Sequence, residues 1–187
     1  MDYARMVEIA DELAKLPESW AVEISGDNVI VIMAPSNPHE LNVRRARQQL
    51  DPQVQRTRPG WVAENGPEVA VPGVKRKRRP DLVVCRESAL EHGTALNVAD
   101  VLLVLEVVSP GNPESDYADK AVDYPTMGIG EYVILDPRKG TVVRHHGPAE
   151  GEDGPRYQYS STVPFGEPLH LGEWVLETDT FLRYNQD

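Results

Sequence analysis

A single charged residue, Glu106, lies in the otherwise apolar run from Val101 to Val108. Such a run is typical of a strand that is buried on both faces of a sheet. A carboxylate in this strand is unstable unless a cation or a hydrogen-bond network compensates for its lost hydration. Asp81 raises the same problem, because it precedes the apolar segment 82–85. If the two strands are neighbours, the two carboxylates lie side by side.

Two adjacent carboxylates are suited to binding a divalent cation. Their repulsion would raise the pKa of one carboxyl group, whereas a shared cation would keep both groups ionised. Oxygen ligands with room for water favour Mg²⁺ or Mn²⁺ over zinc, which prefers histidine and cysteine. Asp81 and Glu106 therefore predict a magnesium or manganese centre that could lower the pKa of a bound water molecule.

The segment that follows the Glu106 strand is expected to form a helix over residues 112–124. Asp116, Lys120 and Tyr124 follow one another at steps of four, so they lie along one stripe of this helix. Lys120 borders the buried face and could reach the carboxylates from a helix packed on the sheet. Two simpler interpretations remain open. Glu106 and Lys120 could form a buried structural ion pair. Asp116 and Lys120 could form a surface pair that contributes about 0.3 to 0.5 kcal/mol to stability.

The distribution of charge bears on the partner of this protein. A formal net charge of −11 is unfavourable for nucleic-acid binding, because phosphate contacts need lysine and arginine. Between residues 40 and 79, however, ten basic side chains stand against four acidic ones, which predicts an electropositive surface on an acidic body. The basic run just before Asp81 could also be an ordinary solvated loop. The candidate phosphate contacts are Arg44, Arg45, Lys75, Arg76, Lys77, Arg78 and Arg79.

Helical and strand patterns mix along the chain, which predicts a single α/β domain over residues 1–187. Helices are expected over residues 2–16, 37–50 and 112–124. Hairpins are expected from segments 20–24 with 29–33 and 131–135 with 141–145, and further strands over 61–63, 68–71, 81–85 and 101–108. The tail from Arg156 onward is polar and β-like.

Five short motifs occur in a fixed order along the chain. The motifs are Arg79-Pro80-Asp81-Leu82-Val83-Val84, Glu106-Val107-Val108-Ser109-Pro110, Asp116-Tyr117-Ala118-Asp119-Lys120 with Tyr124, Gly128-Ile129-Gly130-Glu131-Tyr132, and Asp136-Pro137. In order and spacing they resemble the Uma-two (Uma2) family of restriction endonucleases, a branch of the PD-(D/E)XK nuclease superfamily. The resemblance runs from about Glu23 to Asp136.

The resemblance implies an α/β fold with a restriction-endonuclease-like core, in which helices flank a mixed central β-sheet and extra β-hairpins are attached. It implies that Asp81 and Glu106 bind the metal ion, with the backbone carbonyl of Val107 as a further ligand. The superfamily's usual lysine stands two residues after the glutamate, where this chain has Val108. Lys120, on the following helix, resembles the replacement that this branch uses.

Three further residues are accessory candidates. Glu23 and His39 match positions that are characteristic of the N-terminal half of the family, and Glu23 could approach the metal site. The residues alone also allow blander interpretations, in which His39 is a solvated side chain in a helix's first turn and Glu23 lies on the surface of a strand. Asp116 is the third candidate, as the helical neighbour of Lys120.

Together these features predict a metal-dependent endonuclease that hydrolyses phosphodiester bonds, with DNA as the expected substrate. One alternative is a degenerate nuclease fold that serves as a DNA-binding or protein-interaction module. Another is hydrolysis of a small phosphoester.

The apolar runs are too short to cross a bilayer, so a cytoplasmic protein without a membrane partner is expected. A homodimer is expected by analogy with nucleases that cut both strands.

Overall fold

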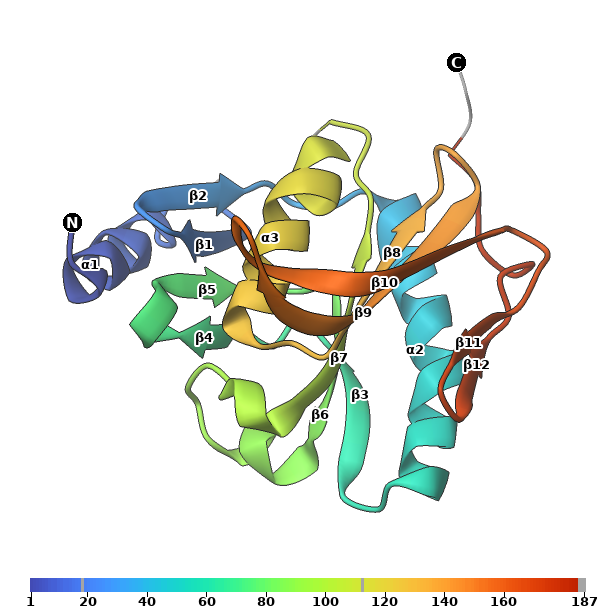
Figure 1. The fold of residues 1–187 in the computed structure, drawn as a ribbon. Coiled ribbons are helices and arrows are strands. Elements are labelled where there is room, and N and C mark those ends of the chain that lie inside the picture. The colour runs from blue at the N-terminus through green and yellow to red at the C-terminus, as the bar shows by residue number, and fades with distance from the viewer. Residues whose placement is uncertain (18, 112, 185–187) are drawn as a thin grey trace.

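The computed structural model describes residues 1–17, 19–111 and 113–184. Within these residues, the central sheet consists of β3 (Trp61–Asn65), β6 (Leu82–Arg86), β7 (Val101–Val107), β8 (Glu131–Asp136), β9 (Thr141–Gly151) and β10 (Gly154–Pro164). Their spatial order is β10-β9-β8-β7-β6-β3 (Figure 1). The pair β7 and β8 is parallel and its neighbours are antiparallel, so the sheet is mixed, as predicted.

One face of the central sheet is covered by α2 (Asn37–Thr57). Val43, Ala46, Leu50 and Val54 are buried on this helix and form a core with the side chains of β7 and β8 that point the same way. The helix runs seven residues beyond the expected end at Leu50. Its apolar spacing continues to Val54, and this burial outweighs the intrahelical hydrogen bond that Pro52 cannot donate.

The opposite face is covered by the crossover between the parallel strands β7 and β8. This crossover contains a π-helical turn, Ser115–Asp119, which leads into α3 (Lys120–Met127). The expected start of this helix at Asn112 lies outside the described residues. The helix continues past Tyr124 and ends at Gly128, whose φ of 86° provides the left-handed conformation that closes a helix.

A smaller sheet lies beside the central one. Its strands are β1 (Ala21–Ser25), β2 (Asn28–Ile32), β4 (Val69–Val71) and β5 (Arg76–Arg78), in the order β2-β1-β5-β4. The first helix, α1 (Tyr3–Leu13), packs on this sheet around Met6 and Ile24 (Figure 1). The expected N-terminal hairpin is confirmed as β1 and β2. The centre of the basic run is a paired strand, β5, and not a loop.

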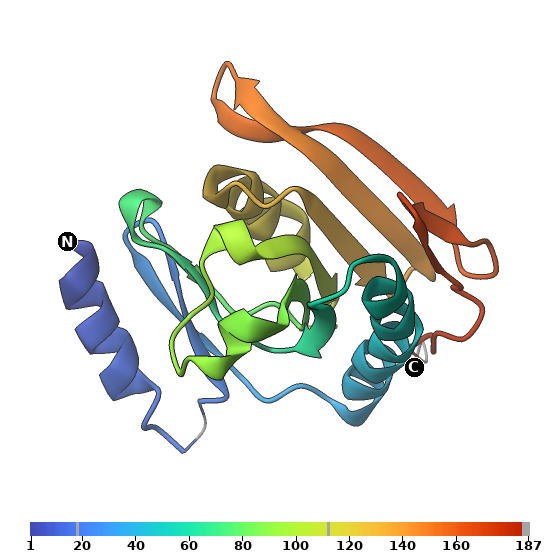
Figure 2. The same ribbon diagram turned by 90° about the horizontal axis from the view of Figure 1, so that it is seen from below.

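The C-terminal part of the chain forms two antiparallel ribbons. Strands β9 and β10 are eleven residues long and extend as one ribbon along the side of the molecule (Figure 2). Strands β11 (Leu169–Leu171) and β12 (Trp174–Leu176) pack against α2, where Gln53 bonds the backbone of Val175. In the described residues, no helix has both the length and the apolar character that a membrane span requires.

Candidate active site

The pairing of β6 with β7 brings Asp81 beside Glu106. Leu82 stands opposite Leu105 in the antiparallel register, so Asp81, which precedes Leu82, and Glu106, which follows Leu105, meet across the pair. The backbone N–H of Asp81 donates to Glu106 Oε2 at 3.3 Å, and the N–H of Val107 donates to Asp81 Oδ2 at 2.7 Å. The expected convergence of the two carboxylates is therefore present.

Lys120 reaches the carboxylates from the start of α3. Its Nζ lies 2.9 Å from Glu106 Oε1 and 2.9 Å from Asp116 Oδ1. One turn further along the helix, Tyr124 donates its hydroxyl to the same oxygen of Glu106. Asp116 is buried, so its interpretation as half of an exposed surface pair is wrong. The stripe predicted along this helix faces the two carboxylates.

Burial and crowding shift the pKa values of these groups in different directions. Burial raises the pKa of Glu106 well above its usual range, and the charges of Asp81 and Asp116 add to this effect although Lys120 opposes it. Burial likewise raises the pKa of Asp116. Burial alone would raise the pKa of Asp81, but the nearby His39 and Lys120 outweigh burial and lower this pKa. Burial favours a neutral Lys120, but the surrounding carboxylates outweigh it and raise the pKa of this amine well above its usual value.

Both His39 and Glu23 are buried. His39 Nε2 lies 3.1 Å from Asp81 Oδ2, and within the described residues its buried Nδ1 has no hydrogen-bond partner. Glu23 accepts a bond from the Arg78 guanidinium at 2.6 Å and another from the backbone N–H of Arg79 at 2.9 Å. The interpretations of His39 as a solvated side chain and of Glu23 as a strand-surface residue are therefore wrong.

Acidic partners bind most of the basic run 75–79 into the fold. Arg78 is fully buried, so it offers no surface to a phosphate in this conformation. Its neighbours are half-buried. The ion pairs of this run are Lys75 with Asp27, Arg76 with Asp123, Lys77 with Glu68, and Arg78 with both Glu23 and Asp123.

The basic residues of α2 have different surroundings. Arg44 is exposed to solvent, whereas Arg45 is half-buried and donates to the backbone carbonyl of Thr180 at 2.5 Å. Arg47, in the next turn, pairs with Glu64 at 2.6 Å. Phosphate contact by Arg44 and Arg45 stays a prediction.

A cavity of about 510 Å³ opens beside the carboxylates. Its floor is acidic, and the side chains of Asp81 and Glu106 are 12% and 2% exposed. One further wall comes from the N-terminal hairpin and another from residues 109–111. The candidate site residues that line the cavity are Glu23, His39, Arg79, Asp81, Glu106, Val107, Asp116 and Lys120.

The donor set at the floor of this cavity fits a hard divalent cation. No group of three or more histidine, cysteine, aspartate and glutamate side chains in the described part of the chain is arranged to enclose an ion. The donors are two carboxylates, Asp81 and Glu106, with the backbone of Val107 beside them. Such a set leaves positions for water, as Mg²⁺ prefers and structural zinc does not. A dication would also offset the excess of carboxylates over Lys120.

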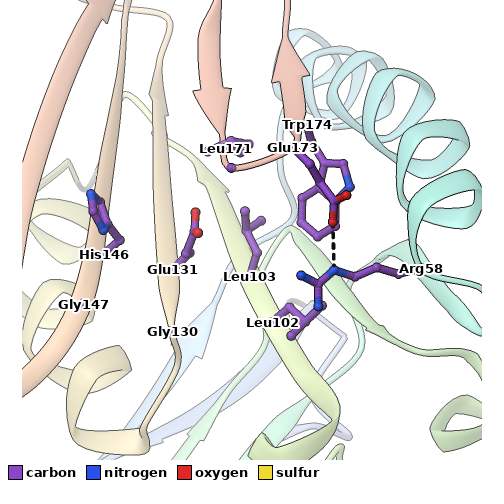
Figure 3. Close-up of a pocket in the computed structure, with 11 residues that line it drawn as sticks. Arg58, Leu102, Leu103, Gly130, Glu131, His146, Gly147, Leu171, Glu173 and Trp174 are labelled. Atoms are coloured by element: carbon purple, nitrogen blue, oxygen red, sulfur yellow. Dashed lines mark hydrogen bonds and ion pairs between the residues drawn. The ribbon is translucent and has the colours of Figure 1, made fainter.

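A second cavity, of about 300 Å³, lies elsewhere, between the sheet and the β11–β12 ribbon (Figure 3). The charged groups that line it are already paired. Arg58 binds Glu173 at 3.1 Å, and Glu131 binds Arg144 at 3.0 Å. His146 stacks on Tyr159 with the ring centroids 5.0 Å apart. This cavity therefore resembles the carboxylate site in neither charge nor donors.

One residue of the site network, Asp123, carries no strong signal in the sequence. Asp123 of α3 binds both Arg76 and Arg78, which come from β5 more than forty positions earlier in the chain. Tyr124 is recognisable as a member of a helical motif, but its bond to Glu106 depends on how α3 is seated on the sheet. A buried Arg78 could be suspected only from the strand pairing that places it inside.

The chain matches one family model. The model is Uma2, described as "Putative restriction endonuclease", and it matches residues 10–179. No curated protein matches the chain. Among solved structures, the chain resembles "a putative nuclease belonging to DUF820" from Anabaena variabilis ATCC 29413, with a TM-score of 0.64, 15% identity and 93% of each chain covered. At this identity the likeness concerns the fold, and it confirms the predicted α/β restriction-endonuclease-like core.

Proposed function

Because this chain belongs to the Uma2 family, we propose that it is a metal-dependent nuclease that hydrolyses phosphodiester bonds in DNA. The observation that carries the proposal is the meeting of Asp81, Glu106 and Lys120 at one cavity. These residues come from separate elements of the chain. Burying two carboxylates and an ammonium together is unfavourable for packing alone, and such clusters are concentrated at functional sites.

In this proposal Asp81 and Glu106 hold Mg²⁺ or Mn²⁺, with the backbone carbonyl of Val107 as a further ligand. The cation would polarise the phosphodiester and lower the pKa of water at the site. Other side chains of the protein also contact each of the two carboxylates. His39 lies against Asp81, while Tyr124 and Lys120 lie against Glu106.

Lys120 acts in this scheme as a positive charge and a hydrogen-bond donor. An ammonium group has three N–H donors, and two of them are matched by Glu106 and Asp116. The third can point into the cavity, which Lys120 lines. There it would orient the attacking water or stabilise the negative charge that develops as the P–O bond of the leaving group breaks. The surrounding carboxylates raise the pKa of Lys120, which is consistent with a charged donor.

Contact with the nucleic acid is assigned to the accessible basic side chains. Arg79 lines the cavity and Arg44 is exposed on α2, so both can meet phosphates. Arg45, Lys75, Arg76 and Lys77 would have to give up part of their internal bonds to do so. The homodimer expected from the sequence remains a prediction.

The test is a cleavage assay on plasmid and single-stranded DNA with Mg²⁺, with Mn²⁺ and with a chelator. The wild-type chain should cut only with a metal, and Glu106→Ala should not cut. Glu131→Ala is the matched control, because Glu131 is a half-buried glutamate paired with Arg144 at the second cavity. It should keep the wild-type rate. Failure of the wild-type chain to cut either DNA would contradict the proposal.

Calorimetric titration with Mg²⁺ separates the proposal from the alternative of a degenerate fold that only binds DNA or protein. A nuclease of this design must bind the metal at Asp81 and Glu106, and Glu106→Ala should abolish that binding. A chain that binds DNA equally well with and without Mg²⁺, and takes up no Mg²⁺, would be the degenerate module instead.

A further inference from the structure

Apolar side chains are exposed at the mouth of the carboxylate cavity. Trp20, Val31 and Met33 are 36%, 38% and 63% exposed, and all three line the same cavity as Asp81 and Glu106. Contiguous apolar groups around a polar floor are a common feature of ligand sites. The mouth therefore offers a surface for a flat apolar group, next to a floor that would receive a phosphate.

Arg79 gives this mouth a charged planar face. Its guanidinium lies over the Trp20 ring, with the carbon 4.9 Å from the ring centroid. Two bonds hold the residue in place, since its Nε donates to the carbonyl of Gly66 at 2.9 Å and its backbone N–H donates to Glu23. Indole rings and guanidinium planes are the surfaces on which unpaired nucleobases stack.

The depth of the carboxylates limits the shape of the substrate. Because Glu106 is only 2% exposed, a phosphodiester must enter the cavity to reach it. A cavity of about 510 Å³ is the size of a pocket for one small ligand. A base-paired nucleotide is held in its stack, and it enters such a pocket only after it is flipped out. An unpaired nucleotide enters without that cost.

The ion pairs of the basic run before Arg79 support the same substrate shape. A protein that binds a long duplex neutralises many phosphates with free lysine and arginine. Here Lys75, Arg76, Lys77 and Arg78 are all bound to carboxylates of the chain itself. These four residues therefore offer few phosphate contacts, so stacking of a base would supply a larger share of the affinity beside the carboxylates.

We propose that this chain acts on an unpaired nucleotide of single-stranded nucleic acid, whose base extends the stack that Arg79 forms with Trp20 while the adjoining phosphate reaches Asp81 and Glu106. This inference rests on the proposed nuclease function and narrows its substrate class. Met33 and Val31 complete the apolar wall beside the base. Duplex DNA is then a poor substrate unless it is locally open.

The test measures binding and cleavage separately. Binding is measured in the presence of Mg²⁺ with two probes, a single-stranded oligothymidylate and a hairpin duplex. Both probes have phosphorothioate linkages, which resist hydrolysis. Stacking of one base contributes about 1–3 kcal/mol, so Trp20→Ala should weaken single-strand binding by about 5- to 150-fold. Trp61→Ala is the matched control, because Trp61 also has an arginine, Arg86, over its ring but lies outside this cavity. It should bind as the wild type does.

A second variant guards against a folding defect. Trp20→Leu keeps an apolar side chain but removes the planar ring, and it should lose single-strand binding to a similar extent at an unchanged melting temperature. Light scattering on the same samples reports the oligomeric state. Single-strand binding that survives both Trp20 variants would overturn the inference. So would a dimer that dissociates in Trp20→Ala with no change in binding, since the apolar mouth would then be a contact between two copies.

The outcomes also separate this inference from the proposed function. Metal-dependent cleavage that favours duplex over single-stranded DNA, and that Trp20→Ala leaves unchanged, would overturn the substrate class and keep the nuclease. A chain that cuts nothing would overturn the nuclease, and the binding arm would still decide whether Trp20 stacks a base.

Discussion

At the scale of single residues, each carboxylate of the site is oriented by a different set of partners. Asp81 accepts one bond from the backbone of β7 and lies against His39 of α2, whereas Glu106 is contacted by Tyr124 and Lys120 of α3. Partners of this kind fix the direction in which a carboxylate presents its oxygens to a metal ion.

His39 provides the first prediction. His39→Leu should weaken Mg²⁺ binding by about 10- to 100-fold, because loss of an outer partner of a ligand has effects of this size. His39→Gln retains an N–H donor and should lose less. Calorimetric titration gives the affinities, with His92→Leu as the control at an exposed histidine. If His39→Leu binds Mg²⁺ as the wild type does, the assigned role of His39 is wrong.

The sequence predicts the central residues because Asp81 and Glu106 contradict their apolar surroundings. A charge in a strand buried on both faces has few explanations, so these two residues are conspicuous from the order of amino acids alone. The burial of His39 and Asp116 is not predictable in this way, since each stands in an ordinary polar segment. Their positions depend on how two helices pack on the sheet, and this packing is set by contacts between residues that are far apart in the chain.

At the scale of elements, the turn between β8 and β9 is closed by one buried carboxylate. Asp136 Oδ1 accepts a bond from the backbone N–H of Arg138 at 3.0 Å, and Oδ2 accepts bonds from the Tyr117 hydroxyl at 3.0 Å and from the Arg138 guanidinium at 2.7 Å. Burial alone would raise the pKa of Asp136, but these donors outweigh it and lower the pKa below its usual value.

The lowered pKa of Asp136 predicts a pH-dependent contribution to stability. The contribution is complete above the pKa of an unfolded aspartate, about 3.9, and is lost as the pH falls through the lower folded value. Asp136→Asn should therefore reduce the free energy of unfolding by about 1–3 kcal/mol near neutral pH and by less in acid. Urea unfolding at several pH values measures this, with the exposed Asp153→Asn as control. A difference that does not shrink in acid would contradict the assignment.

The elements themselves are largely predictable from periodicity and turn residues. The N-terminal hairpin, the two strands of the site and the β8–β9 hairpin all occur where the pattern indicates them. The full length of α2 is missed because Pro52 is typical of a helix end, although the burial of the helix continues to Val54. The length of the β9–β10 ribbon is missed because β10 is mostly polar and exposed, so it shows little of the alternating pattern that indicates a strand.

At the scale of the whole molecule, Arg78 connects three elements. It extends from β5, and its guanidinium binds Glu23 of β1 and Asp123 of α3. The small sheet is thereby attached to the helix that carries Lys120. The basic run that predicts an electropositive surface is used instead, in large part, to join parts of the protein. Sequence counts of charge cannot distinguish these two uses.

Removing this connection should destabilise the protein strongly. Arg78→Met is expected to reduce the free energy of unfolding by about 3–5 kcal/mol, because it leaves the buried Glu23 without its counter-charge and removes one of the two arginines that bind Asp123. The control is Arg86→Met, since Arg86 is exposed and pairs with Asp100 at 3.3 Å, and a change of about 1 kcal/mol or less is expected there. Urea unfolding of both variants provides the comparison. Equal effects would mean that the buried network contributes little.

The central claim is that Asp81, Glu106 and Lys120 form the catalytic centre of a metal-dependent nuclease, and Lys120 tests it most directly because it is not a metal ligand. The measurement is the rate of Mg²⁺-dependent DNA cleavage by Lys120→Met, with melting temperature and Mg²⁺ affinity determined on the same sample and the exposed Lys15→Met as control. A folded, metal-binding Lys120→Met chain whose rate has fallen by about 100-fold or more is the predicted result. The same folded chain cutting at the wild-type rate would contradict the claim and leave Lys120 as a structural partner of Glu106.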